Sequence, residues 1–121
     1  MDAARVKQIA RAGFLIGRSV HTVAEGVKVS GSGAVDYLIF GTIFETASKP
    51  GVAVAGLDQL GRASAAIPVP VLAVGGITLA RASGVARTGA AGVAAIALFA
   101  DGPADELPGI VEQIAIGFDT P

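Results

Sequence analysis

The sequence contains no cysteine, and this absence excludes disulfide bonds, thiolate metal sites and cysteine nucleophiles. Charge is also scarce, because only 16% of the 121 residues are charged, against roughly 25% in ordinary soluble domains. The formal net charge is −1, so a basic surface for nucleic acid is not expected. No apolar stretch reaches the roughly 18 residues of a membrane-spanning helix, so no membrane partner is expected either.

Small and apolar residues are abundant instead. Apolar residues make up 52% of the chain, 17 residues are glycine, and only 5% are aromatic. This composition excludes a disordered tail and predicts a core of Ala, Val, Ile and Leu. The length predicts a single α/β domain over residues 1–121. The charged, amphipathic start of the chain predicts no signal peptide, and the expected compartment is the cytoplasm.

Short apolar runs alternate with stretches of helical spacing along the chain. The runs are apolar throughout, as expected for parallel strands covered on both faces, and their alternation with helices predicts an α/β protein. The runs are residues 14–17, 37–41, 69–74 and 92–99. The helical stretches are residues 3–12, 21–28, 57–67, 79–87 and 107–114.

Glycine ends or follows three of these runs, at Gly17, Gly41 and Gly75-Gly76. Parallel α/β folds place their ligand sites at the carboxyl ends of the strands, so we expect the site at this edge. Two architectures fit: a small open doubly wound sheet, and half of an eight-stranded barrel, whose usual length is roughly 250 residues. Periodicity does not choose between them.

Four motifs choose. They are Ile16–Thr22 (IGRSVHT), Asp36–Lys49 (DYLIFGTIFETASK), Ile67–Ile77 (IPVPVLAVGGI) and Thr88–Ala94 (TGAAGVA), in this order. Together they resemble the second half of the thiamine-phosphate synthase family, which includes the related thiazole tautomerases of the TenI type. The resemblance spans about residues 12–99. It implies a parallel (β/α) fold of the TIM-barrel type, with four βα units that correspond to strands five to eight of a (β/α)8 barrel.

The resemblance also implies an activity and its partners. The family makes thiamine phosphate by a transferase reaction that couples a phosphorylated thiazole to hydroxymethylpyrimidine diphosphate. Mg2+ is implied as a cofactor, with acidic ligands in the first half of the barrel, which these residues do not represent. Half a barrel has two unpaired strand edges and an apolar inner face. We therefore expect either a homo-oligomer or a complementary half-barrel as a partner.

Two loops are candidate phosphate sites. The backbone N–H groups of Gly75 and Gly76, ahead of a helix, suit a phosphate dianion, although the glycines alone also explain a tight turn. The resemblance assigns this turn to the thiazole phosphate. Lys49 stands beside the hydroxyls of Thr46 and Ser48, a combination that suits phosphate oxygens or simply a solvated loop. The resemblance implies that Lys49 meets the diphosphate leaving group and that Thr46 contacts the thiazole phosphate.

Ser19 and His21 are expected just past the first strand, at the barrel mouth. The resemblance implies that Ser19 contacts the diphosphate. In the tautomerase branch His21 would be the general base that moves a proton on the thiazole ring. As the only histidine, His21 has no partner for a metal pair, so no metal site is predicted. The alternative is that Ser19 or Thr22 caps the next helix.

The last strand departs from the family pattern. Ala95-Ile96-Ala97 stands where the family reads Val-Ile-Ser, so a side-chain donor is lost and the backbone around Ile96 is expected to meet phosphate instead. Asp36 precedes a strand at the opposite end and is interpreted as structural. Three functions stay open on the residues: a synthase, a tautomerase that uses His21, and a non-catalytic phosphate-binding or assembly half-barrel.

Overall fold

The computed structural model describes residues 3–46, 51 and 53–119. Four parallel strands form one sheet in the order β1-β2-β3-β4. The strands are β1 (Gly17–Val20), β2 (Tyr37–Phe40), β3 (Val71–Val74) and β4 (Gly92–Ala94). The helices are α1 (Ala3–Ile9), α2 (Val23–Gly31), α3 (Gly56–Ala66), α4 (Leu79–Arg87), α5 (Ile96–Ala100) and α6 (Leu107–Asp119), with a 3-10 turn, η1, at Ala104–Glu106.

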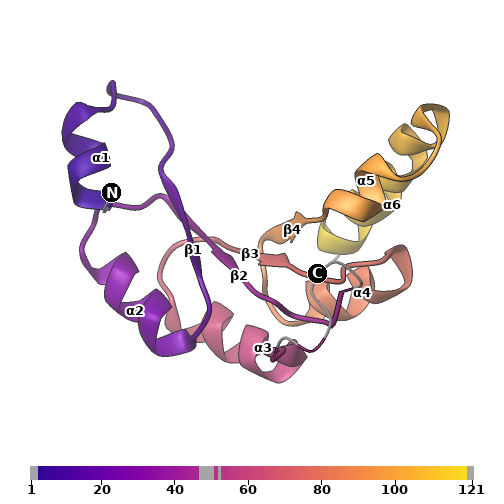
Figure 1. The fold of residues 1–121 in the computed structure, drawn as a ribbon, viewed down its shortest axis with the longest axis horizontal. Helices are drawn as coiled ribbons and strands as arrows, with labels where there is room; N and C mark the ends of the chain where they lie inside the picture. The colour runs from indigo at the N-terminus through magenta and orange to yellow at the C-terminus, as the bar shows by residue number, and fades with distance from the viewer. Residues whose placement is uncertain (1–2, 47–50, 52, 120–121) are drawn as a thin grey trace.

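The sheet is curved, and α2, α3 and α4 line its convex face (Figure 1). The first of these helices packs on β1 and β2, the second on β3, and the third on β4. The concave face is open, with α1 beyond one end of the sheet and α5 and α6 beyond the other. A doubly wound sheet has helices on both faces and a reversal in its strand order. The sequential order and the single helical layer therefore confirm the barrel-type α/β fold.

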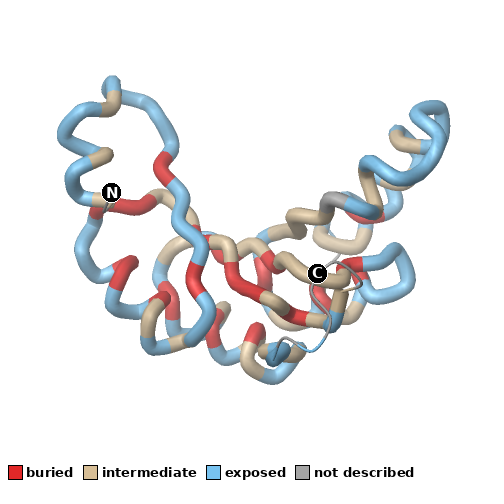
Figure 2. The backbone as a smooth tube through the Cα atoms, viewed as in Figure 1, coloured by how far each residue is buried: buried red, intermediate tan, exposed pale blue. Residues whose placement is uncertain are grey.

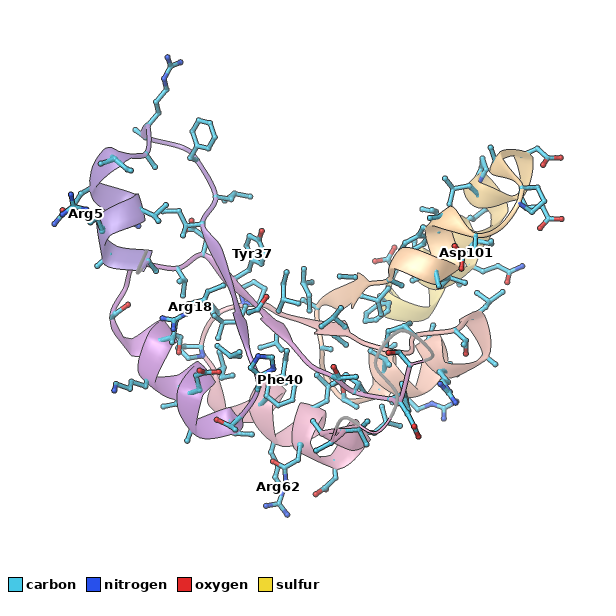
Figure 3. The ribbon with its side chains drawn as sticks, viewed as in Figure 1. Arg5, Arg18, Tyr37, Phe40, Arg62 and Asp101 are labelled. Atoms are coloured by element: carbon cyan, nitrogen blue, oxygen red, sulfur yellow. The ribbon has the colours of Figure 1, made fainter. Side chains whose placement is uncertain are left out.

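Side-chain alternation along the strands divides the sheet into two unlike faces. Val20, Leu38 and Phe40 are fully buried against the helices. Figure 2 shows that the buried positions concentrate between the sheet and this helical layer. On the other face Tyr37 and Ile39 are only half-buried. Figure 3 shows Tyr37 on the open side of the sheet.

The first strand lies further along the chain than predicted. It spans Gly17–Val20 and not residues 14–17, while Phe14 and Leu15 are 65% and 74% exposed. The strand begins at Gly17. A Cβ at this position would collide with the Tyr37 ring on the neighbouring strand, which explains why the residue is glycine. Phe14 and Leu15 lie in the connection that precedes the strand. The prediction was wrong because apolar residues also occur in such connections.

The fourth strand is shorter than predicted. It ends at Ala94, and the rest of the apolar run forms the five-residue helix α5. A short run that is apolar throughout does not distinguish a strand from a helix segment by periodicity, and Ala and Leu favour the helix. The bounds of β2, β3, α3 and α4 agree with the predictions to within two residues. Three helices end elsewhere than predicted: α1 at Ile9 and not at residue 12, α2 at Gly31 and not at 28, and α6 at Asp119 and not at 114.

Threonine caps fix where two helices start after their strands. The Thr22 hydroxyl accepts from the Glu25 N–H at 3.0 Å, and the Thr78 hydroxyl accepts from the Arg81 N–H at 3.2 Å. Thr22, rather than Ser19, is thus the cap that the sequence left open. At the opposite end of the sheet, the Asp36 carboxylate accepts from the Ile16 N–H at 2.7 Å, which confirms its structural role.

Candidate functional site

The carboxyl ends of β1 and β2 meet through His21. Its Nδ1 lies 3.0 Å from the carbonyl oxygen of Gly41, the residue after β2. A carbonyl only accepts, so Nδ1 carries the hydrogen, and Nε2 is the basic nitrogen of the neutral ring. The backbone N–H of His21 donates to the Glu25 carboxylate at 2.8 Å. The exposed His21 side chain is therefore oriented by its neighbours at the predicted edge.

The loop after β2 joins the glycine turn after β3 through backbone contacts. The Ile43 N–H donates to the Val74 carbonyl, and the Phe44 N–H donates to the Gly75 carbonyl, both at 3.0 Å. Gly75 and Gly76 have φ of +103° and +64°, which favours glycine. A Cβ on Gly76 would lie 2.7 Å from the Phe44 Cβ. The tight turn that the sequence allowed is therefore present, and the loop after β2 packs directly on it.

Helix α4 begins immediately beyond this turn, with Thr78 as its N-cap. The first N–H groups of a helix have no partner within it, and the aligned peptide dipoles add partial positive charge at that end. Arg81 supplies a full positive charge in the first turn: its Nη1 donates to the Gly76 carbonyl at 2.9 Å. Its guanidinium also lies 4.6 Å from the centroid of the Phe44 ring. The site edge is thus electropositive around Gly75-Gly76.

The loop predicted to carry Lys49 leaves and returns at this same edge. The Ala55 N–H donates to the Thr42 carbonyl at 2.7 Å, and the Gly56 N–H donates to the Ile43 carbonyl at 3.1 Å. Thr46 is half-buried in this loop. Lys49 and Ser48 lie outside the described residues.

Two predicted residues occupy positions that differ from expectation. Ser19 lies within β1, opposite Ile39, and not past the strand, because the strand starts at Gly17. Alternation with the buried Val20 places Ser19 on the concave side. Ile96 is the first residue of α5 and follows the end of β4. It therefore stands near the same edge as the glycine turn, since Ala94 pairs with Val74.

Sequence reasoning missed three residues that build this edge: Thr42, Phe44 and Arg81. Thr42 packs so closely that a Cβ on Gly75 would lie 2.5 Å from its Cγ2. Arg81 is exposed in the first turn of α4. Its position three residues after the capping Thr78 was the only signal in the sequence that it stands beside the turn.

Among residues 3–46, 51 and 53–119, no group of three or more His, Asp or Glu side chains is placed to hold a metal ion. Two hollows lie away from the glycine turn. One, of about 230 Å³, is lined by residues of the α1–β1 connection and by Asp36. The other, of about 600 Å³, lies between α1 and α2 beside Arg18.

No described helix has the length and hydropathy needed to cross a membrane.

The fold and the edge together define a class of protein. A sequentially ordered parallel sheet, helices on its convex face and a glycine turn ahead of a helix at the carboxyl edge are the features of a (β/α)-barrel wall with its ligand side. A family model described as thiamine monophosphate synthase matches residues 1–99. The chain belongs to the thiamine monophosphate synthase family.

Individual relatives agree. A thiamine-phosphate synthase of Methanocella arvoryzae is 42% identical over 91 residues, which are 74% of this chain and 42% of the relative. One from Roseiflexus castenholzii is 38% identical over 107 residues, covering 88% of this chain and 46% of the relative. A solved thiamine phosphate pyrophosphorylase from Pyrococcus furiosus superposes with a TM-score of 0.75 at 31% identity, covering 94% of this chain and 56% of that one. The chain spans about half the length of the curated relatives it matches.

Proposed function

We propose that this chain binds a thiazole phosphate at the carboxyl edge of its sheet and, within a completed barrel in the cytoplasm, couples it to hydroxymethylpyrimidine diphosphate. The observation that carries the proposal is the joining of the loop after β2 to the Gly75-Gly76 turn. The Phe44 N–H donates to the Gly75 carbonyl at 3.0 Å, so the two segments that we predict to bind phosphate are in direct contact. The relatives named thiamine-phosphate synthases support the same reaction.

The thiazole phosphate would be held by the turn and the helix behind it. Backbone N–H groups of Gly75, Gly76 and the first turn of α4 are donors suited to a dianion, and the helix end adds favourable potential. The hydroxyl of Thr46 would add a side-chain donor from the neighbouring loop. The backbone around Ile96 would serve where the family has a serine. This arrangement fixes the phosphate and thereby orients the thiazole ring.

The diphosphate would be held on the other side of the same edge. In the proposed reaction the C–O bond to the diphosphate breaks, the bonding electrons leave with the diphosphate oxygen, and the thiazole is joined to the carbon. Negative charge grows on the leaving group, and the Lys49 ammonium and Ser19 hydroxyl would stabilise it. The family resemblance places the magnesium ligands in the first half of the barrel, so none is assigned to this chain.

Thiazole tautomerisation is the second candidate, and the His21 geometry favours it. The Nδ1 hydrogen is directed to the Gly41 carbonyl at 3.0 Å, so the basic Nε2 is the nitrogen that would take a proton from the thiazole ring and return it. This role needs no diphosphate and no Lys49. It therefore separates cleanly from the coupling reaction.

Calorimetric titration tests the binding step. The chain is titrated with thiazole phosphate and, as a control, with the same thiazole without its phosphate. Binding of only the phosphorylated compound is expected. Equal binding of both, or of neither, would contradict the proposed site.

Turnover by two variants separates the enzymes. Lys49→Ala is expected to reduce coupling by about 100-fold or more, on the scale of a lost transition-state donor, whereas His21→Ala should leave most of it. If His21→Ala abolishes tautomerisation and Lys49→Ala leaves tautomerisation intact, the second candidate is established. Binding without either turnover, in the presence of Mg2+ and the rest of the barrel, would leave the non-catalytic half-barrel.

A complementary half-barrel is the partner that we propose for the concave face. Within the part of the chain that the structure describes, β1 and β4 are the edge strands of the sheet, and unpaired edges invite further strands. Tyr37 and Ile39 on the concave face are only half-buried. The length of the relatives supports this partner. Sedimentation of the chain with the unmatched part of the Methanocella arvoryzae synthase should show a one-to-one complex. A dimer of the chain alone would indicate a second copy, and a monomer that binds nothing would contradict both.

A further inference from the structure

We propose that Arg81 is a positioning residue that locks the phosphate-binding turn and couples it to the loop after β2. The inference rests on the proposed function of that turn. Arg81 lies in the first turn of α4, where its own N–H is held by the Thr78 hydroxyl at 3.2 Å. Its side chain then reaches back to two different segments, the glycine turn and the loop after β2.

The contacts of Arg81 close a ring. Its Nη1 donates to the Gly76 carbonyl at 2.9 Å, a charge-assisted hydrogen bond. Its guanidinium lies 4.6 Å from the centroid of the Phe44 ring, within the range of a cation–π interaction. The Phe44 N–H in turn donates to the Gly75 carbonyl at 3.0 Å. Turn, helix and loop therefore hold one another, and loss of the guanidinium opens the ring at two contacts.

A glycine pair gives this lock a purpose. Gly75 and Gly76 both have positive φ, and glycine visits the opposite backbone conformations with nearly equal ease. The ψ of Gly76 is therefore weakly restrained, and the peptide after it can rotate over a limited range unless something holds its carbonyl. In a planar trans peptide the C=O and the following N–H point in opposite directions. Rotation of this peptide would turn the Ile77 N–H away from a bound phosphate.

Arg81 limits that rotation by binding the Gly76 carbonyl. The Ile77 N–H of the same peptide is thereby directed away from the guanidinium and kept in one orientation. Oriented backbone N–H groups are what make a turn an anion site. The contact with Phe44 extends the effect to the loop after β2.

Binding of thiazole phosphate to paired variants tests the inference. Arg87 lies in the last turn of the same helix and is also exposed, so Arg87→Ala is the matched control for the loss of one positive charge. Arg81→Ala is expected to weaken binding about fivefold to tenfold, the scale of one charge-assisted hydrogen bond with a cation–π contact. Arg87→Ala should change it less than twofold. Equal weakening by the two variants would overturn the lock and indicate only a charge effect.

Arg81→Lys separates position from charge. Lysine retains the positive charge and a donor but lacks the planar guanidinium, so it should restore binding only in part. Full restoration by lysine would contradict the requirement for a planar group over Phe44.

Amide hydrogen exchange without ligand gives an independent measurement. Arg81→Ala should accelerate exchange of the Phe44 amide several-fold, while Arg87→Ala leaves it unchanged. Unchanged Phe44 exchange in Arg81→Ala would overturn the inference. If the unmodified chain binds no thiazole phosphate, the proposed function fails, whereas the exchange measurement still decides whether Arg81 locks the turn.

Discussion

The two faces of the sheet come from the same four strands but differ in how completely they are covered. On the convex face Leu38 and Phe40 have no exposed surface. Their neighbours on the concave face, Tyr37 and Ile39, are half-buried and open to solvent. Alternation along a strand sends successive residues to opposite faces, and here the residues on both faces are apolar or aromatic. The comparison teaches that this chain covers the convex face of its sheet with its own helices. The concave face has the apolar composition of a core but is not packed like one.

The first prediction compares the loss of stability when adjacent residues on the two faces are truncated. Phe40→Ala removes a ring that is fully buried against the helices, and it should lower the free energy of unfolding by about 3–5 kcal/mol. Ile39→Ala, on the half-buried face, should lower it by only about 1 kcal/mol in the isolated chain. Urea unfolding of both variants measures the difference. Equal losses would show that the concave face is as well packed as the convex one.

The second prediction concerns what the concave face is for. Leu72 is half-buried on the same face as Ile39, with which it is paired across β2 and β3. Leu72→Asp should weaken association with the complementary half by about tenfold or more, because burying an unpaired charge is unfavourable. Val27→Asp is the matched control, since Val27 is an exposed apolar residue on α2. Sedimentation that finds both variants equally weakened would remove the concave face as the interface.

The third prediction compares two helix caps. Thr78→Ala and Thr22→Ala each lose a hydroxyl that accepts a backbone N–H, and each should lower the free energy of unfolding by about 1 kcal/mol. Only Thr78→Ala should also weaken thiazole phosphate binding, because Thr78 starts the helix behind the glycine turn. Serine at either position should restore stability. Weaker binding in Thr22→Ala alone would move the phosphate site to the end of β1.

Glycine marks the limit of some elements but not of all, because Gly17 was expected to end the first strand and instead begins it. The second strand and α4 were placed nearly as observed, because Gly41 and the Gly75-Gly76 pair mark their limits. Residues 14–17 and 92–99 misled because apolar character also occurs in connections and in short helices. Periodicity carries no information on that distinction.

The site was predictable in its parts but not in its contacts. Motif and position predicted that the glycine turn and His21 lie at the carboxyl edge, and the structure has them there. That these residues and Thr46 bind substrate stays a prediction. The contact of Arg81 with Phe44 joins residues that are distant in the sequence. It depends on how β2 and β3 pair, which no local pattern reports. The direction of the His21 ring is likewise set by a tertiary contact, the Gly41 carbonyl.

The central claim is that the carboxyl edge of this half-barrel binds the phosphate of a thiazole. Residue-resolved NMR of the chain during titration with thiazole phosphate tests it most directly. The account predicts that the largest amide shifts occur at Gly75, Gly76 and the first turn of α4, and that they vanish when the thiazole lacks its phosphate. Largest shifts at Asp36 and the α1–β1 connection, or equal shifts with both compounds, would contradict it.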